Sequence, residues 1–402
     1  MLIALSTRLL ASAIRRNVLL TDESPLLYHA ATLGFNYFDF GFVRRGLAGS
    51  VVYLLGPDRL LGTAVFYVLC AASVAAGAAT VFLHLRLRAG AQWIYVLLFV
   101  ALMLRWAEDP GRTDLAVAAL LIGAALAVQA GRLVLACVCV GVSLSVHETG
   151  LVFGMSLLAA LLFDNARWRQ VPRRTAAKGL AVLASFVTLY LLLGLLPHAD
   201  VPTMVSVVRS HFPTHEYVDW AIYFAVSGSR GVRTSICQNL GDPTYLLHLA
   251  SGLFVVAIFI ALLRHRGRPS LPALLLAAVP PFLFLSALAN DLSRWMVLAA
   301  LNVWLVAAVG EGDRGSADPD ADDPRPGRWN VVRIVAALLM TPLVHPKTWP
   351  IDDPIFSPAP VIDHAVQALG GPSTPRFRAA LARCDAGWRS VLERGRAVKP
   401  AR

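Results

Sequence analysis

The chain has 402 residues, of which 57% are hydrophobic and 15% are charged, and its mean hydropathy is +0.62. This composition excludes an ordinary soluble globular protein. The formal net charge of +11 rests almost wholly on arginine, and in so apolar a chain it indicates loops that face anionic lipid rather than a nucleic-acid partner.

Apolar runs of about 15–25 residues recur along the chain, which is the length an α-helix needs to cross a bilayer core. The runs do not alternate apolar and polar residues, as the strands of a membrane β-barrel would. We therefore predict an all-α, polytopic integral membrane protein with about 10–11 transmembrane helices. The clear runs cover residues 60–84, 91–106, 115–130, 177–196, 244–263, 270–289 and 294–310, with a shorter one near 331–344.

Residues 132–163 form one further apolar stretch, interrupted only by His147 and Glu148. A single straight helix of this length would measure about 48 Å, well beyond a hydrocarbon core of about 30 Å. Two shorter helices that turn at His147–Glu148 also place all the arginine-rich short loops on one side, which the positive-inside rule makes cytoplasmic. We therefore predict two helices here rather than one strongly tilted span.

This topology places five polar segments together on the outer side. They are residues 21–59, 107–114, 147–148, 197–243 and 290–293. The predicted organisation is a helical membrane domain over 1–344, with a cytoplasmic loop of disordered composition over 311–328, and a proline-rich outer tail over 345–402 that includes a short helix. Residues 2–20 carry three arginines, so they either cross the membrane or lie on its surface. The arginine-rich, lysine-poor style is typical of a GC-rich bacterium, so we expect the inner membrane, with the outer side facing the periplasm.

The first outer loop contains the stretch FNYFDFGFVRRGLAG, residues 35–49. Asp39 within it can act as a general base toward a hydroxyl or bind a divalent metal ion. Arg44 and Arg45 offer the fork geometry that suits phosphate. The alternative is structural: Asp39 pairs with an arginine, and the two arginines anchor an interfacial helix.

The segment RWAEDPGRTD, residues 105–114, follows in the next outer loop. Glu108 and Asp109 are candidate catalytic acids, and Arg112 is a candidate for substrate binding. Thr113 or Asp114 is well placed as a helix cap, so capping alone can explain Asp114. The pair His147 and Glu148 is either a proton-handling or metal-binding pair or a polar turn that ends one helix, since ionisable residues within apolar sequence usually serve a function.

The long outer loop adds two features. His211 and His215 are four positions apart, but Pro213 between them disfavours the helix that would align them as metal ligands, so we assign no metal site. Arg230 and Arg233 form a second candidate phosphate-binding patch; the alternative is that they lie in a solvated loop.

Asp291 and Arg294 lie in a short turn, where they are an N-cap with an ion pair or a part of the shared site. Cys237 and Cys384 both fall on the outer side, and in an oxidising compartment they are expected to form a disulfide.

The layout resembles the GT-C class of polytopic glycosyltransferases, with an aromatic first outer loop that carries an acid and with arginines, histidine and acids on the outer face. The resemblance implies that Asp39 is the catalytic base and that Arg44, Arg45, Arg230 or Arg294 contacts a lipid phosphate. It also implies a polyprenyl-phosphate-linked sugar donor and a glycan or lipid-linked acceptor. Many members carry paired acids in the first loop, whereas here a second acid must come from Glu108 or Asp109.

The interpretation as a GT-C-like glycosyltransferase has two alternatives, one within enzymes and one from another class. A polysaccharide polymerase or ligase of the O-antigen type also uses lipid-linked sugars and arginines, often without an acidic base. A multi-pass transporter would place its polar residues at the midplane of broken helices. No cofactor is required by the sequence, a divalent metal ion stays open, and the expected partners are the donor, the acceptor and membrane lipid, with no nucleic acid.

Overall fold

The computed structural model describes residues 25–43, 46–84, 89–107, 112–164, 172–193, 200–212, 218, 221–222, 236, 245–264, 269–288 and 292–312. Throughout these residues the regular secondary structure is α-helical, which confirms the predicted all-α class. The predicted span near 331–344, the cysteine pair and the tail over 345–402 lie outside the described residues.

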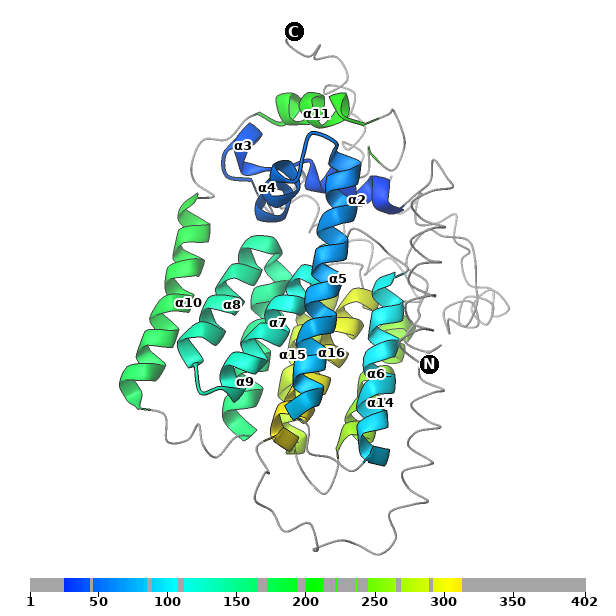
Figure 1. Ribbon diagram of the computed structural model, residues 1–402, viewed down its shortest axis with the longest axis vertical. Coiled ribbons are helices and arrows are strands. Elements are labelled where there is room, and N and C mark those ends of the chain that lie inside the picture. Colours follow the sequence, from blue (N-terminus) through cyan, green and yellow to red (C-terminus); the bar gives the residue numbers. More distant parts are fainter. Residues whose placement is uncertain are drawn as a thin grey trace, which may run out of the picture.

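Long helices alternate in direction to form a bundle, and short helices lie across one end of it (Figure 1). The bundle helices are α5 (Arg59–His84), α6 (Ala89–Ala107), α7 (Asp114–Gln129), α8 (Leu133–Val146), α9 (Glu148–Asp164), α10 (Arg173–Leu193), α14 (Tyr245–Leu263), α15 (Leu271–Leu288) and α16 (Leu292–Gly312). The short helices are α2 (Pro25–Leu33), α3 (Tyr37–Phe40), α4 (Gly46–Leu54) and α11 (Val201–Ser210), and we call these four the cap.

Helix length follows from the apolar runs. Each predicted run in the described part of the chain appears as a helix, with ends that differ from the prediction by a few residues. By length and composition, three of these helices are able to cross a membrane: α5, α10 and α15. Shorter apolar segments of α6, α7, α8, α14 and α16 pack with them.

The stretch over 132–163 is broken as predicted. α8 ends at Val146, His147 adopts extended backbone geometry with φ −163° and ψ 137°, and α9 starts at Glu148. α8 and α9 then run side by side in opposite directions. The prediction of two helices is therefore confirmed.

α16 forms the centre of the bundle, because every residue from Trp295 to Val309 is buried. The ring of Trp304 packs against Phe82 and Phe99, and its indole N–H donates a hydrogen bond of 3.0 Å to the carbonyl of Tyr95. This donor–acceptor pair satisfies the one polar atom of a large side chain that is otherwise placed for its apolar area.

Asn302, also on α16, repairs a defect in its neighbour α15. Pro281 lies inside α15 and has no N–H, so the carbonyl of Ala277 loses its usual helical donor. The side-chain amide of the buried Asn302 donates to that carbonyl at 3.0 Å and to the carbonyl of Phe153 in α9 at 2.9 Å. A single polar side chain thereby joins three helices.

The cap has a small apolar core of its own. Phe35 and Phe40 from the first loop pack with Met204, Val205 and Val208 of α11. α11 starts with Asp200 as N-cap, whose carboxylate accepts from the amide of Thr203 at 2.8 Å. Two segments that are far apart in sequence thus form one layer over the end of the bundle (Figure 1).

Candidate functional site

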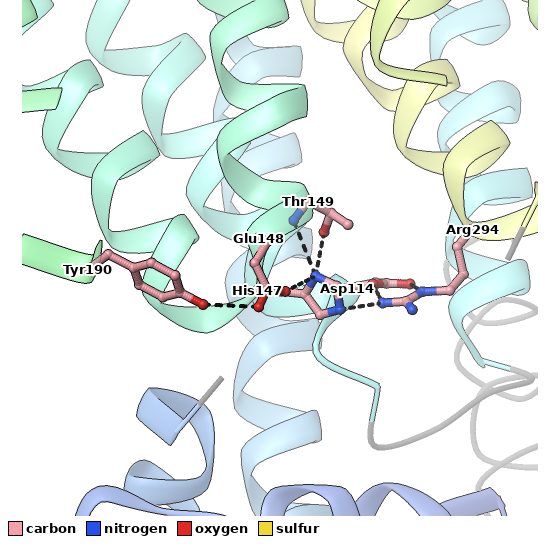
Figure 2. A network of polar contacts seen from close by, with 6 residues as sticks. All are labelled: Asp114, His147, Glu148, Thr149, Tyr190 and Arg294. Carbon is pink, nitrogen blue, oxygen red and sulfur yellow. Dashed lines mark hydrogen bonds and ion pairs between the residues drawn. The ribbon is translucent and has the colours of Figure 1, made fainter. Parts of the chain in front are cut away.

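The described parts of the polar segments 107–114 and 147–148 lie at one end of the bundle, beneath the cap, which is itself built from described residues of 21–59 and 197–243 (Figure 1). The first residue of α7, the break between α8 and α9 and the start of α16 meet there. Figure 2 shows the side chains that result, and we call them the polar network: Asp114, His147, Glu148, Thr149, Tyr190 and Arg294.

Asp114 and Arg294 form the buried centre of the network. The guanidinium donates from Nε to Oδ2 at 2.8 Å and from Nη2 to Oδ1 at 2.5 Å, and the two side chains are only 3% and 10% exposed. Bidentate pairs of this kind combine strong charge-assisted bonds with a fixed orientation. The expectation that capping explains Asp114 is wrong, because its carboxylate faces α16, while the N-cap residue Thr113 makes no side-chain cap bond.

Arg294 also determines the chemical form of His147. Its Nη2 lies 3.4 Å from Nε2 of the imidazole. A guanidinium can only donate, so the contact is favourable when Nε2 carries no proton. The ring proton then sits on Nδ1, which is 2.9 Å from Oγ1 of Thr149 and 3.6 Å from Oε2 of Glu148.

One further contact favours the opposite tautomer. The backbone amide of Thr149 approaches Nδ1 of His147 at 3.2 Å, as it would toward an unprotonated nitrogen. In that tautomer a ring N–H would point at the guanidinium of Arg294 in a buried place, which sets two donors and a full positive charge against each other. We therefore assign the neutral ring with its proton on Nδ1, an assignment that rests on the hydrogen-bond network.

Glu148 is the more accessible acid of the network, with a side chain that is 24% exposed. Its Oε1 accepts a hydrogen bond of 3.0 Å from the hydroxyl of Tyr190 at the end of α10. The ring of Phe42 packs edge-on against Tyr190, with 5.5 Å between centroids. Burial raises the pKa of Tyr37, the backbone of Leu47 opposes that shift, and the negative charge of Glu148 adds to it. The aromatic first loop therefore lies against this carboxylate.

Asp39 belongs to a second, separate arrangement. Asn36 is the N-cap of α3: its Oδ1 accepts from the amides of Phe38 and Asp39, and its Nδ2 donates to the Asp39 carboxylate at 2.8 Å. Arg59 at the start of α5 lies 3.8 Å from the same carboxylate, and its guanidinium stacks over the ring of Tyr53 at 4.4 Å. Asp39 is 28% exposed, so it is oriented by its partners and still reachable from solvent.

The one-turn helix α3 connects the two arrangements. Tyr37 and Asp39 are two positions apart, so they point to different sides of α3. The ring of Tyr37 stacks on Phe42, which packs against Tyr190, while the carboxylate of Asp39 faces Arg59. The loop is held down by close packing, because a Cβ on Gly49 would overlap the carbonyl oxygen of Phe35. The hydroxyl of Ser50 also accepts a hydrogen bond of 2.9 Å from the backbone amide of Tyr37.

Of the predicted site residues, the structure joins Arg294, His147 and Glu148, while Asp39 makes its contacts with Asn36 and Arg59 instead. Arg112 is partly buried and lies two positions before Asp114. The other candidates lie outside the described residues: Arg44, Arg45, Glu108, Asp109, Arg230, Arg233 and Asp291.

Four contributors were missed by the sequence reasoning: Asn36, Arg59, Thr149 and Tyr190. Asn36 could have been found, because an asparagine before a short aromatic helix is a favoured N-cap. Arg59 ends a polar loop and Tyr190 lies within an apolar run, so neither position carries a signal of its own. Among the described residues, no group of three or more histidine, cysteine, aspartate or glutamate side chains is arranged to hold a metal ion.

Comparison with protein-family models, with curated proteins and with solved structures finds no match to this chain.

Proposed function

We propose that the chain is a polytopic membrane glycosyltransferase with a GT-C-like layout. In this proposal it transfers a sugar from a polyprenyl-phosphate-linked donor to a hydroxyl of a glycan or lipid-linked acceptor, at the periplasmic face of a bacterial inner membrane. One observation carries the proposal: ionisable side chains from α7, α9 and α16 converge at one end of a bundle of apolar helices, beneath an aromatic loop that carries an accessible acid. Charges in apolar helices are costly, so their convergence indicates a function.

Exposed apolar surface supports the membrane setting. Leu83 on α5, Leu180 on α10 and Phe254 on α14 are 85%, 66% and 62% exposed. Only 11% of the most apolar stretch of α10 is buried inside the molecule. Large apolar faces on several helices need an apolar environment, and hydrocarbon supplies one to helices whose backbone groups are already bonded.

The chemistry requires a base, a route for the leaving group and a place for the lipid. The acceptor O–H bond breaks as its proton passes to the Asp39 carboxylate, and the acceptor oxygen forms a bond to the anomeric carbon of the donor. The bond from that carbon to the phosphate oxygen breaks, and the phosphate leaves with the electron pair. Arg44 and Arg45 follow α3 directly in sequence and are our candidates to stabilise that charge. Arg294 is engaged by Asp114, so we no longer assign it to the phosphate.

The test is a transfer assay with the full chain in proteoliposomes. Polyprenyl monophosphates that carry different hexoses and pentoses serve as donors, and the release of polyprenyl phosphate is measured with an acceptor glycan present. We expect transfer by the wild-type chain and a fall in kcat of about 100-fold to 10,000-fold in Asp39→Asn, since the amide cannot take a proton. The matched control is Asp58→Asn: Asp58 is an exposed helix cap near the same loop, and asparagine caps equally well.

Two results would overturn parts of the proposal. Full activity of Asp39→Asn would remove the base assignment and favour the polymerase-type mechanism, in which arginines carry the reaction. Movement of the lipid-linked sugar across the membrane without any covalent product would mean that the chain is a transporter.

A further inference from the structure

We propose that Glu148, Tyr190 and Phe42 form a subsite that binds the hydroxyl-bearing ring of a sugar. Asp114, Arg294 and His147 are the positioning residues of this subsite. The inference deepens the proposed function and rests on it, because it names the part of that site that holds the glycosyl unit.

The two acids of the network differ in whether a substrate can reach them. Asp114 is almost fully buried, and both of its oxygens accept from Arg294, so it is unsuited to meet a substrate. Glu148 is 24% exposed and uses Oε1 for one bond from Tyr190. At this exposure a hydroxyl of a ligand can reach the Glu148 carboxylate, and carboxylate oxygens are acceptors for such donors.

His147 is not placed to exchange a proton with a substrate. In the assigned tautomer its Nδ1 already holds a proton and its Nε2 faces Arg294 at 3.4 Å, so neither nitrogen is placed to take a proton from a substrate. The ring is 3% exposed, which also keeps it from direct contact. Its Nδ1–H points toward Thr149 and Glu148 and stabilises the negative charge beside it. His147 is thus a support for the carboxylate rather than an acid–base catalyst.

The mixture of a carboxylate and aromatic rings fits a sugar ring. A sugar ring offers hydroxyl donors at its edge and a C–H face that is apolar. The carboxylate of Glu148 suits the hydroxyls, and the half-buried rings of Phe42 and Tyr190 suit the apolar face. Tyr37 stacks on Phe42 with 5.5 Å between ring centroids and an interplanar angle of 16°, which extends the aromatic surface along the first loop. Sites for small molecules are typically lined by apolar and aromatic side chains, with a small number of polar groups that orient the ligand.

The binding experiment uses the full chain in lipid nanodiscs and a panel of methyl pyranosides and methyl furanosides, followed by saturation-transfer NMR. Cyclohexanol, which has a ring but one hydroxyl, is the control ligand. We expect at least one glycoside to bind, and Glu148→Gln to weaken that binding by about tenfold to a hundredfold, since it loses hydrogen bonds to a charged acceptor. Tyr190→Phe and Phe42→Leu weaken it by about twofold to tenfold.

Matched control variants remove similar groups elsewhere. Asp164→Asn changes a carboxylate at the other end of the bundle, where it accepts from the amide of Ser270. Tyr245→Phe removes a hydroxyl that donates to the carbonyl of Ser286. Both are expected to bind the glycoside as the wild type does. Equal binding by wild type and Glu148→Gln, or tight binding of cyclohexanol, would overturn the subsite.

The positioning role has its own readout. In the ¹⁵N spectrum of histidine-labelled protein, with His147→Asn for assignment, we expect a neutral ring that is protonated on Nδ1, and a mixture of tautomers in Arg294→Met. A wild-type ring protonated on Nε2 would contradict the role of Arg294. In the transfer assay Glu148→Gln is expected to raise KM more than it lowers kcat. Glycoside binding without any transfer would leave the subsite standing and remove the proposed function, whereas transfer with an unchanged KM in Glu148→Gln would do the reverse.

Discussion

The pair Asp114–Arg294 allows the sharpest prediction about stability. Arg294→Met removes both donors from a carboxylate that is 3% exposed and leaves its charge in apolar surroundings. Breaking a buried ion pair from one side costs about 3–5 kcal/mol. Asp114→Leu should cost less, about 2–3 kcal/mol, because the longer arginine is 10% exposed and can turn its charge toward the end of the bundle.

The double variant Asp114→Leu/Arg294→Met separates the pair from its surroundings. With neither charge present the penalty for an unpaired ion disappears, so we expect the double variant to be more stable than Arg294→Met by about 2 kcal/mol or more. The measurement is the free energy of unfolding of the full chain in mixed micelles, from a denaturant titration followed by helical circular dichroism. If the losses in unfolding free energy of the two single variants simply added in the double variant, Asp114 and Arg294 would not act as a buried ion pair. A loss below about 1 kcal/mol in Arg294→Met would contradict the pair in the same way.

Two further predictions concern the cap. Gly49→Ala should destabilise the first loop by about 1–3 kcal/mol or more, because the new Cβ meets the carbonyl of Phe35, while Gly123→Ala, with only an ordinary contact, should not; limited proteolysis of the loop reports the difference. Hydrogen bonds from the side chain and then the backbone of Thr203 hold the pKa of Asp200 below its usual 3.8, so the cap bond of α11 is fully present above that value and is lost as pH falls through the lowered pKa. The protection of the Thr203 amide from hydrogen exchange should fall over this pH range in the wild type and show no such fall in Asp200→Asn. The same pH profile of protection in both proteins would contradict the role of the Asp200 carboxylate.

The helices could be predicted because their cause is local. Apolar runs specify helices of matching length. The stretch 132–163 predicts a break because a single helix of that length would exceed the hydrocarbon core, and the ionisable residues His147 and Glu148 mark where the break falls. The placement of the polar segments at one end then follows from counting helices that alternate in direction. These inferences need only the order of residues along the chain.

The partners within the site could not be predicted in this way. Asp114 and Arg294 are 180 positions apart, and whether they meet depends on the rotation of α7 and α16 about their own axes. That rotation is set by how α16 packs in the centre of the bundle, which no single run of residues specifies. The sequence therefore offered local explanations, a cap for Asp114 and an ion pair with Asp291 for Arg294, where the structure shows a long-range pair.

Three of the described acids at this end of the bundle, Asp114, Asp39 and Glu148, differ in what they can do because they differ in exposure and in partners. Asp114 is buried and doubly bonded to one arginine, which makes it a fixed structural charge. Asp39 and Glu148 are 28% and 24% exposed, and each is oriented by a neutral donor, Asn36 for one and Tyr190 for the other. An oriented carboxylate that is also partly exposed can accept from the hydroxyl of a ligand. Asp39 lies on α3 itself, and Phe42 of the same loop packs against Tyr190, the partner of Glu148. A substrate that reaches both acids must therefore contact the aromatic first loop, and this makes that loop the part of the chain where substitutions should alter substrate choice.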